Sequence, residues 1–197
     1  MTDGREKLKK DLDILKAMVE ELTNYLSSEV LYWPMFKANY PKMTLGGYLM
    51  RQRRLQRLSY LLSDSKQVEL KHIANQFNEM TFDKNALLMK KGTEELRTRV
   101  NQWKEHLQEY WDSEIIEKQY FATDVEVRTM ITDLIFELEI DLSQVDKDLL
   151  FQIDSLDDEL RTNWQGGDFI WPDEWVPAYG KGDYWWLYGT PRIPENN

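Results

Sequence analysis

The first segment of the chain repeats apolar residues at alternating spacings of four and three. The series is Leu8, Leu12, Leu15, Val19, Leu22 and Leu26. On a helix these positions form one apolar seam, so the pattern predicts a helix over residues 5–27. The heptad pattern lasts about three repeats before Tyr32-Trp33-Pro34 breaks it. We therefore expect the seam to pack inside the same molecule rather than in a coiled coil.

A second helix is predicted after an apolar connection. Residues 29–43 carry Pro34 and Pro41 among large apolar side chains, so we expect this connection to lie on the helices. Thr44 can cap a helix that runs to residue 63. Its expected inward face consists of Leu45, Leu49, Leu55, Leu58 and Leu62.

Helical periodicity continues from Ser65 to Lys118. We interpret this stretch as two helices, either separate or fused, with Gly92-Thr93 as the expected interruption. The first helix is expected to bury Val68, Ile73 and Phe77, which would leave Glu69 and His72 toward solvent. The second is expected to bury Leu96, Val100, Trp103, Leu107 and Tyr110.

Two further helices follow. One is expected to begin at Asp124, with a stripe of Val127, Ile131, Leu134 and Leu138. Ser143 with Asp146 resembles a capping box before the last helix, whose stripe is Leu149, Ile153, Leu156 and Leu160. Gly166-Gly167 is expected to end that helix.

No segment shows sustained alternation of apolar and polar residues between turn residues, so the predicted fold class is all-α. The short connections favour an antiparallel helical bundle of five or six helices over residues 1–167. Two helical hairpins joined by the long middle helices would give the same sequence pattern. Residues 168–197 form a Trp/Tyr/Pro-rich C-terminal strap that we expect to pack on the bundle, giving a single domain overall.

The strap is the most unusual part of the sequence. Two prolines, Pro172 and Pro177, forbid a long helix there. Its aromatic residues are Phe169, Trp171, Trp175, Tyr179, Tyr184, Trp185, Trp186 and Tyr188. Because each ring carries a large apolar area, we expect most of them to fill grooves of the bundle. The partner-binding candidates, if some stay on the surface, are Trp171, Trp175, Tyr179, Trp185 and Trp186.

Charge is distributed unevenly along the chain, whose net charge is −10. Residues 1–104 hold 19 lysines and arginines against 13 acidic residues, whereas residues 105–197 hold 6 against 22. We expect the two halves to neutralise each other in part. The acidic stretch from Asp141 to Glu159 is an alternative docking face for a basic protein. The absence of cysteine, of a secretory h-region and of a long apolar run predicts a cytoplasmic protein with no membrane span.

The only dense basic cluster is Arg51-Gln-Arg53-Arg54-Leu-Gln-Arg57. Its four arginines, Arg51, Arg53, Arg54 and Arg57, are candidate anion-binding residues because a guanidinium group matches phosphate geometry. The alternative to anion binding, which we expect, is that these arginines form ion pairs with acidic residues of the C-terminal half. Nucleic acid is disfavoured, because a net charge of −10 repels the polymer at long range.

No reaction signature is present. Glu69 and His72 have the spacing of a carboxylate-bridged metal motif, but the second histidine, His106, precedes its glutamate, so only half of the motif exists. We therefore predict no metal, no cofactor and no catalytic residue. The sequence favours a non-enzymatic helical protein that serves as a protein–protein interaction or scaffold module. The alternatives are a nucleic-acid-associated subunit using Arg51–Arg57 and a metal-binding helical bundle enzyme.

Overall fold

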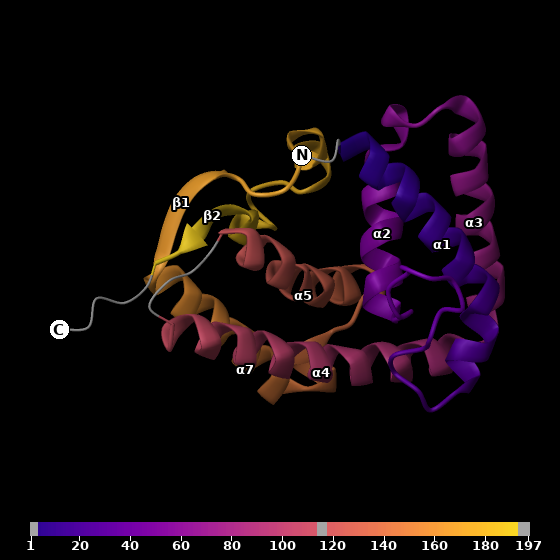
Figure 1. Cartoon of the computed structure of the whole chain (residues 1–197). Coiled ribbons are helices and arrows are strands. Elements are labelled where there is room, and N and C mark those ends of the chain that lie inside the picture. The colour runs from indigo at the N-terminus through magenta and orange to yellow at the C-terminus, as the bar shows by residue number, and fades with distance from the viewer. Residues whose placement is uncertain (1–3, 114–117, 193–197) are drawn as a thin grey trace. The chain divides into compact units, whose positions relative to one another are not determined.

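The computed structural model describes residues 4–113 and 118–192 and is shown in Figure 1. The chain divides into two compact units, Met1–Glu95 and Leu96–Asn197. Most of the described residues are helical, which confirms the predicted class. The division into a bundle over 1–167 and a strap over 168–197 stays a prediction.

The N-terminal unit contains α1 (Gly4–Ser27), α2 (Leu45–Arg57), α3 (Asp64–Phe82) and the start of α4 (Asn85–Trp111), up to Glu95. The chain runs along α1, returns along α2 and turns again into α3, as an antiparallel bundle requires (Figure 1). All six residues of the predicted apolar seam on α1 are buried, from Leu8 to Leu26. The prediction of this first helix is therefore confirmed.

Thr44 caps α2 as predicted. Its backbone is extended and its Oγ1 accepts a hydrogen bond from the Gly47 amide at 3.0 Å. The helix ends at Arg57 instead of residue 63, and the 3₁₀ turn η1 (Ser59–Leu61) follows it. Leu58 and Leu62 are nevertheless buried, because the tighter turn keeps both side chains on the core side.

The connection between α1 and α2 is held at its ends. Trp33 and Met43 exchange two backbone hydrogen bonds of 3.0 and 2.8 Å, and the Met43 side chain is fully buried. Phe36, however, is 86% exposed, so the expectation that the whole segment lies on the helices is wrong at that ring.

The interruption predicted at Gly92-Thr93 is wrong. The break falls at Asp83-Lys84, and α4 (Asn85–Trp111) runs through Gly92. Within α4 the Thr93 hydroxyl donates to the Met89 carbonyl at 2.9 Å, which satisfies this polar side chain inside the helix. Val68, predicted to be buried, is 67% exposed. The buried stripe of α3 follows helical spacing through Leu70, Ile73, Phe77 and Thr81.

The described helices of the C-terminal unit are the end of α4 followed by α5 (Lys118–Glu137), the single turn α6 (Leu142–Val145) and α7 (Lys147–Thr162). Asp146 is the N-cap of α7 and accepts a hydrogen bond from the Leu149 amide at 3.0 Å. Ser143 lies inside α6, and its hydroxyl donates to Asp141, the cap of that turn, so its predicted capping of the last helix is wrong.

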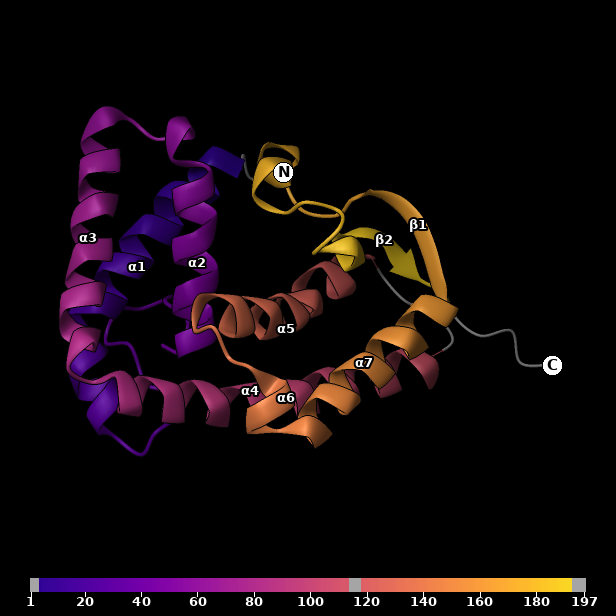
Figure 2. The same cartoon turned by 180° about the vertical axis from the view of Figure 1, so that it is seen from behind.

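The predicted absence of strands is wrong at the C-terminal end. Instead of continuing to Gly166-Gly167, α7 ends at Thr162 and leads into β1 (Trp164–Phe169), as Figure 2 shows. β1 pairs antiparallel with β2 (Tyr188–Pro191). Between the strands the chain forms two 3₁₀ turns, η2 (Asp173–Ala178) and η3 (Trp185–Leu187). Residues 164–191 therefore form a hairpin whose long connection carries most of the aromatic rings of the strap.

One glycine is required by the hairpin. Gly189 has a φ of +147°, and a Cβ at this position would lie 2.2 Å from the carbonyl oxygen of Gln165. A side chain would also press against the indole of Trp164. Only glycine therefore allows the two strands to approach at this point.

Candidate partner-binding surface

The aromatic rings of the C-terminal segment mostly form a core. Trp171, Trp175, Tyr179 and Trp186 are buried, with exposed fractions between 0 and 9%. Edge-to-face contacts connect them, such as Trp171–Tyr179 at 5.0 Å between ring centroids. Four of the five predicted partner-binding rings are therefore interior residues. Trp185, the fifth, is half-buried.

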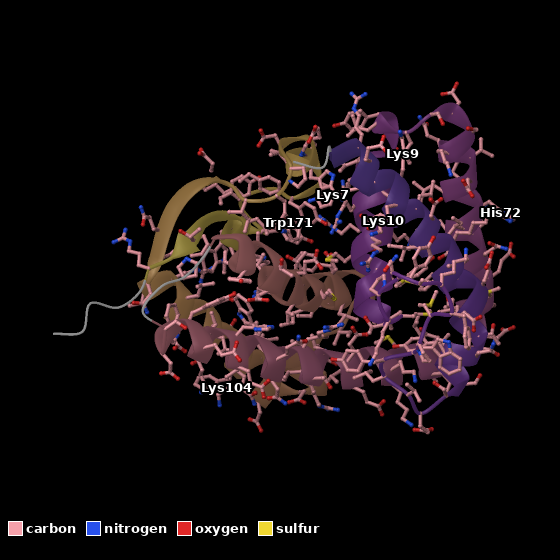
Figure 3. All side chains as sticks on the ribbon, viewed as in Figure 1. Lys7, Lys9, Lys10, His72, Lys104 and Trp171 are labelled. Atoms are coloured by element: carbon pink, nitrogen blue, oxygen red, sulfur yellow. The ribbon has the colours of Figure 1, made fainter. Side chains whose placement is uncertain are left out.

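Hydrogen bonds tie this aromatic core to α5. Trp171, labelled in Figure 3, donates its indole N–H to the Ala122 carbonyl at 2.7 Å. Trp186 donates to the Thr129 hydroxyl at 3.3 Å, and Tyr184 donates to Asp133 at 2.5 Å. Because three polar ring tips reach partners on α5, the segment is held in one arrangement.

A buried ion pair supports the same core. The Arg128 guanidinium donates to both Asp157 oxygens, at 2.8 and 2.7 Å, and to the Thr132 hydroxyl at 2.6 Å. It also lies 3.9 Å from the ring centroid of Trp186. The guanidinium thus joins α5, α7 and η3 through contacts on three sides.

A shallow cavity of about 260 Å³ opens beside this ion pair. At the cavity, the Arg161 guanidinium carbon stacks 4.7 Å from the ring centroid of Trp185. Asp183 also lines the cavity. The two guanidinium groups lie over the two indoles, and the carboxylates of Asp157 and Asp183 line the same cavity. These contacts account for the arrangement as internal packing.

The exposed face of α7 is acidic and carries an aromatic ring. Of the seven acidic residues from Asp141 to Glu159, Asp141 caps α6, Asp146 pairs with Arg97 at 3.0 Å and Asp157 is the buried partner of Arg128. The other four are exposed: Asp148, Asp154, Asp158 and Glu159. Phe151 lies among them in the helix, and 73% of it is exposed.

A second cavity of about 260 Å³ lies on the β-hairpin. Its lining includes the exposed stretch of β1 from Gln165 to Asp168 and, from β2, Gly189 and Thr190. This surface carries no catalytic combination of side chains. Three of its eight lining residues are glycines, and sequence periodicity gave no signal for it.

The predicted anion-binding arginines of α2 do not form an open cluster. Arg54 is 3% exposed and binds Asp11 of α1 at 2.8 Å, and the Arg51 Nε lies 3.3 Å from the same carboxylate. Arg53 is half-buried and Arg57 is exposed. The acidic partner lies on α1, in place of the C-terminal half where pairing was expected.

Glu69 and His72 do not form a metal site in the structure. Hydrogen bonds from Lys66 and Lys16, each at 3.0 Å, hold the pKa of the Glu69 carboxyl below its usual value. His72 is exposed on the outer side of α3 (Figure 3). Across residues 4–113 and 118–192, no three metal-ligating side chains come together.

Two buried charged groups of the N-terminal unit were missed in the sequence. Glu95 is fully buried and accepts a hydrogen bond from the Gly46 amide at 2.9 Å, at the start of α2. Lys91 donates to the carbonyls of Ser28 and Val30, and burial lowers its pKa. Both side chains bind backbone groups that lie far away in the sequence. The periodicity of apolar residues therefore could not reveal that these charged groups are buried.

Comparison with known protein families, with curated proteins and with solved structures found no match for this chain. Among the described residues, no helix combines the length and the apolar composition that crossing a membrane would need.

Proposed function

We propose that this protein is a non-enzymatic protein–protein interaction module, and that its C-terminal unit binds a basic segment of another protein. The location that we propose is the cytoplasm, in keeping with the absence of cysteine. The proposal rests on the exposed surface of α7 and on the charge of the unit that carries it.

The charge asymmetry follows the division into two units. Residues 1–95 hold 16 lysines and arginines against 13 acidic residues, a net charge of +3. Residues 96–197 hold 9 against 22, a net charge of −13. An excess of this size attracts basic partners and raises their rate of association at low ionic strength.

The observation that carries the proposal is Phe151. Its ring is 73% exposed on the same helix as the exposed carboxylates of Asp148, Asp154 and Asp158. Acidic surface alone is ordinary solvated helix, whereas aromatic rings are enriched among the residues that dominate binding energy. An exposed ring with Asp148 three residues before it and Asp154 three residues after it suits a partner segment that combines lysine or arginine with apolar side chains.

A selection from random peptides tests this proposal and does not require the partner to be identified first. Full-length protein is immobilised and presented with a library of 12-residue peptides. We expect the recovered peptides to be enriched in lysine, arginine and apolar residues, and their affinity to fall as salt rises. The matched control is a variant that keeps the helix but changes its surface: Phe151→Ser with Asp148→Asn and Asp154→Asn.

The outcomes are distinct. Basic peptides that bind wild type at least about tenfold more tightly than this variant support the proposal, because a lost aromatic anchor alone is worth about 1–2 kcal/mol or more. Recovery of acidic or uncharged peptides, or equal affinity for both proteins, would contradict it. Circular dichroism of the variant verifies that the helix is intact.

A further inference from the structure

The outer edge of β1 carries backbone groups that point away from β2. Arg192 donates its amide to the Asn163 carbonyl, which makes these residues a hydrogen-bonded pair next to the hairpin. In an antiparallel ladder such pairs alternate with non-bonded pairs. Trp164 opposite Pro191 and Gly166 opposite Gly189 are therefore non-bonded pairs. The N–H and C=O groups of Trp164 and Gly166 consequently face the outer edge.

This edge is open to solvent. Residues 165–168 are all exposed, and no other strand of the described chain pairs with β1 besides β2. Native proteins usually protect a strand edge with proline, charge, cover or a β-bulge. β1 has one register irregularity, between Gly166 and Phe169, and it lies beyond the Trp164–Gly166 edge. The other strand follows that rule: Pro191 occupies a non-bonded position of β2, where its missing N–H would have faced the outer edge, and its side chain is buried.

Nothing inside the fold requires glycine at position 166. A Cβ built there would meet no atom within 4 Å, in contrast to Gly189, where a Cβ would collide with the backbone. The neighbouring Gly167 would also meet only ordinary contact, at 3.6 Å. Two adjacent glycines on an exposed strand leave room for another backbone to approach closely.

The cavity on the hairpin provides space beside this edge. It has a volume of about 260 Å³, and its lining includes Asp168 and the half-buried Phe169. An added strand places alternate side chains on opposite faces, so one of them could enter this cavity. Asp168 and the net charge of −13 on the unit favour a basic segment over an acidic one.

We propose that the basic partner segment binds in an extended conformation, as a strand added to the outer edge of β1 at Trp164–Gly166. This inference rests on the proposed function and names its recognition mode. Main-chain hydrogen bonds to Gly166 and Trp164 provide part of the affinity, and side-chain contacts provide the preference for basic residues. Phe151 and the carboxylates of α7 contribute a separate contact.

The test uses wild-type protein and a basic peptide recovered in the random-peptide selection. Single N-methyl groups are placed on successive backbone amides of the peptide, and affinities are measured by calorimetry. An added strand turns only alternate amides toward β1, so N-methylation should weaken binding about 3- to 10-fold at every second central position. Equal effects at consecutive positions, or none, would overturn the added strand.

A protein variant gives an independent readout. Gly166→Pro removes the outward N–H without breaking a hairpin hydrogen bond, because Gly166 is at a non-bonded position. The matched control is Gly182→Ala, a change at another exposed glycine with no atom within 4 Å of an added Cβ. We expect Gly166→Pro to weaken the peptide about 3- to 10-fold and the control to leave it unchanged.

The two proposals fail in different ways. If basic peptides bind through Phe151 but show no alternation on N-methylation, the added strand is wrong and the proposed function stands. If no basic peptide is recovered, both fail. If Gly166→Pro is misfolded, the N-methylated peptides measured against the wild-type protein still test whether the peptide binds as an added strand. A concentration-dependent dimer that loses its interface in Gly166→Pro would show that a second copy, and not a basic partner, occupies the edge.

Discussion

Replacement of Arg128 by alanine should destabilise the C-terminal unit strongly. The side chains of Arg128 and Asp157 are only 7% and 11% exposed, so the pair is almost fully removed from water. Truncation of the arginine leaves the Asp157 carboxylate buried without the guanidinium group that balances its negative charge. It also removes the cation from the face of Trp186.

The expected magnitude follows from these geometries. Breaking a buried ion pair by removing one partner costs about 3–5 kcal/mol, because the remaining charge stays desolvated. For a chain of this size, such a loss lowers the thermal midpoint by roughly 6–20 °C. The double variant Arg128→Met with Asp157→Leu should recover most of the loss, since neither side chain then buries a charge.

Tryptophan fluorescence during urea unfolding is a suitable assay, because seven of the eight tryptophans lie in residues 96–197. Arg161→Ala is the matched control: this arginine also stacks on an indole, but its side chain is 55% exposed and its partner Asp158 is 79% exposed. The control should cost less than about 1 kcal/mol. A loss below about 1 kcal/mol for Arg128→Ala would refute the view that the pair is a desolvated part of the core.

Three further changes give defined outcomes. Gly189→Ala should lower the free energy of unfolding by about 1–3 kcal/mol through backbone strain at its φ of +147°. The control Gly180→Ala, where an added Cβ lies in open space, should change the free energy of unfolding by less than about 0.5 kcal/mol. Thermal denaturation compares the two variants. Asp11→Ala should cost about 2–4 kcal/mol because the guanidinium of Arg54, 3% exposed, loses this carboxylate; urea unfolding followed by circular dichroism measures it. Glu69→Gln tests how stability depends on pH. The folded pKa of the Glu69 carboxyl lies below its ordinary value, so the ionised carboxylate stabilises the fold, by less than about 1 kcal/mol. This contribution is present at neutral pH and is lost as the pH falls through the folded pKa. Wild type and this variant should therefore differ at pH 7 and converge once the pH lies below the folded pKa; a constant difference would contradict the ion-pair interpretation.

The helices of the N-terminal unit were largely predictable, because they depend on local signals. The spacing of leucines from Leu8 to Leu26 defined α1, and the Thr44 hydroxyl defined the start of α2. The break between α3 and α4 was misplaced, because a glycine in a long helix costs only about 1 kcal/mol, and α4 continues through Gly92, which is buried.

The hairpin could not be predicted, because its pairing joins Trp164–Phe169 to Tyr188–Pro191 across an irregular connection. Gly166-Gly167 has the appearance of a helix stop when only local sequence is considered. The open edge that we propose as a binding surface depends on which backbone groups β2 leaves unbonded, and this follows from register alone. The sequence predicted that most rings of the segment are buried, as Trp171, Trp175, Tyr179 and Trp186 are. It did not predict that Trp185 is the candidate ring that stays half-buried.

The ion pairs show the same limit. Arg51 and Arg54 were expected to pair with the acidic C-terminal half, yet their partner is Asp11. Charge counts predict that arginines find carboxylates, but they do not identify which one, because that choice depends on how α1 and α2 pack.

Hydrogen exchange of the backbone amides in residues 164–192 tests the account most directly. The amides of Ile170, Trp175 and Leu187 donate to carbonyls at 2.8–3.0 Å within the aromatic core. They should exchange as slowly as the central amides of α5, while the outward amide of Gly166 exchanges fast until a basic peptide binds. Exchange of Ile170, Trp175 and Leu187 at the rate of an unstructured peptide would contradict both the core and the binding edge built upon it.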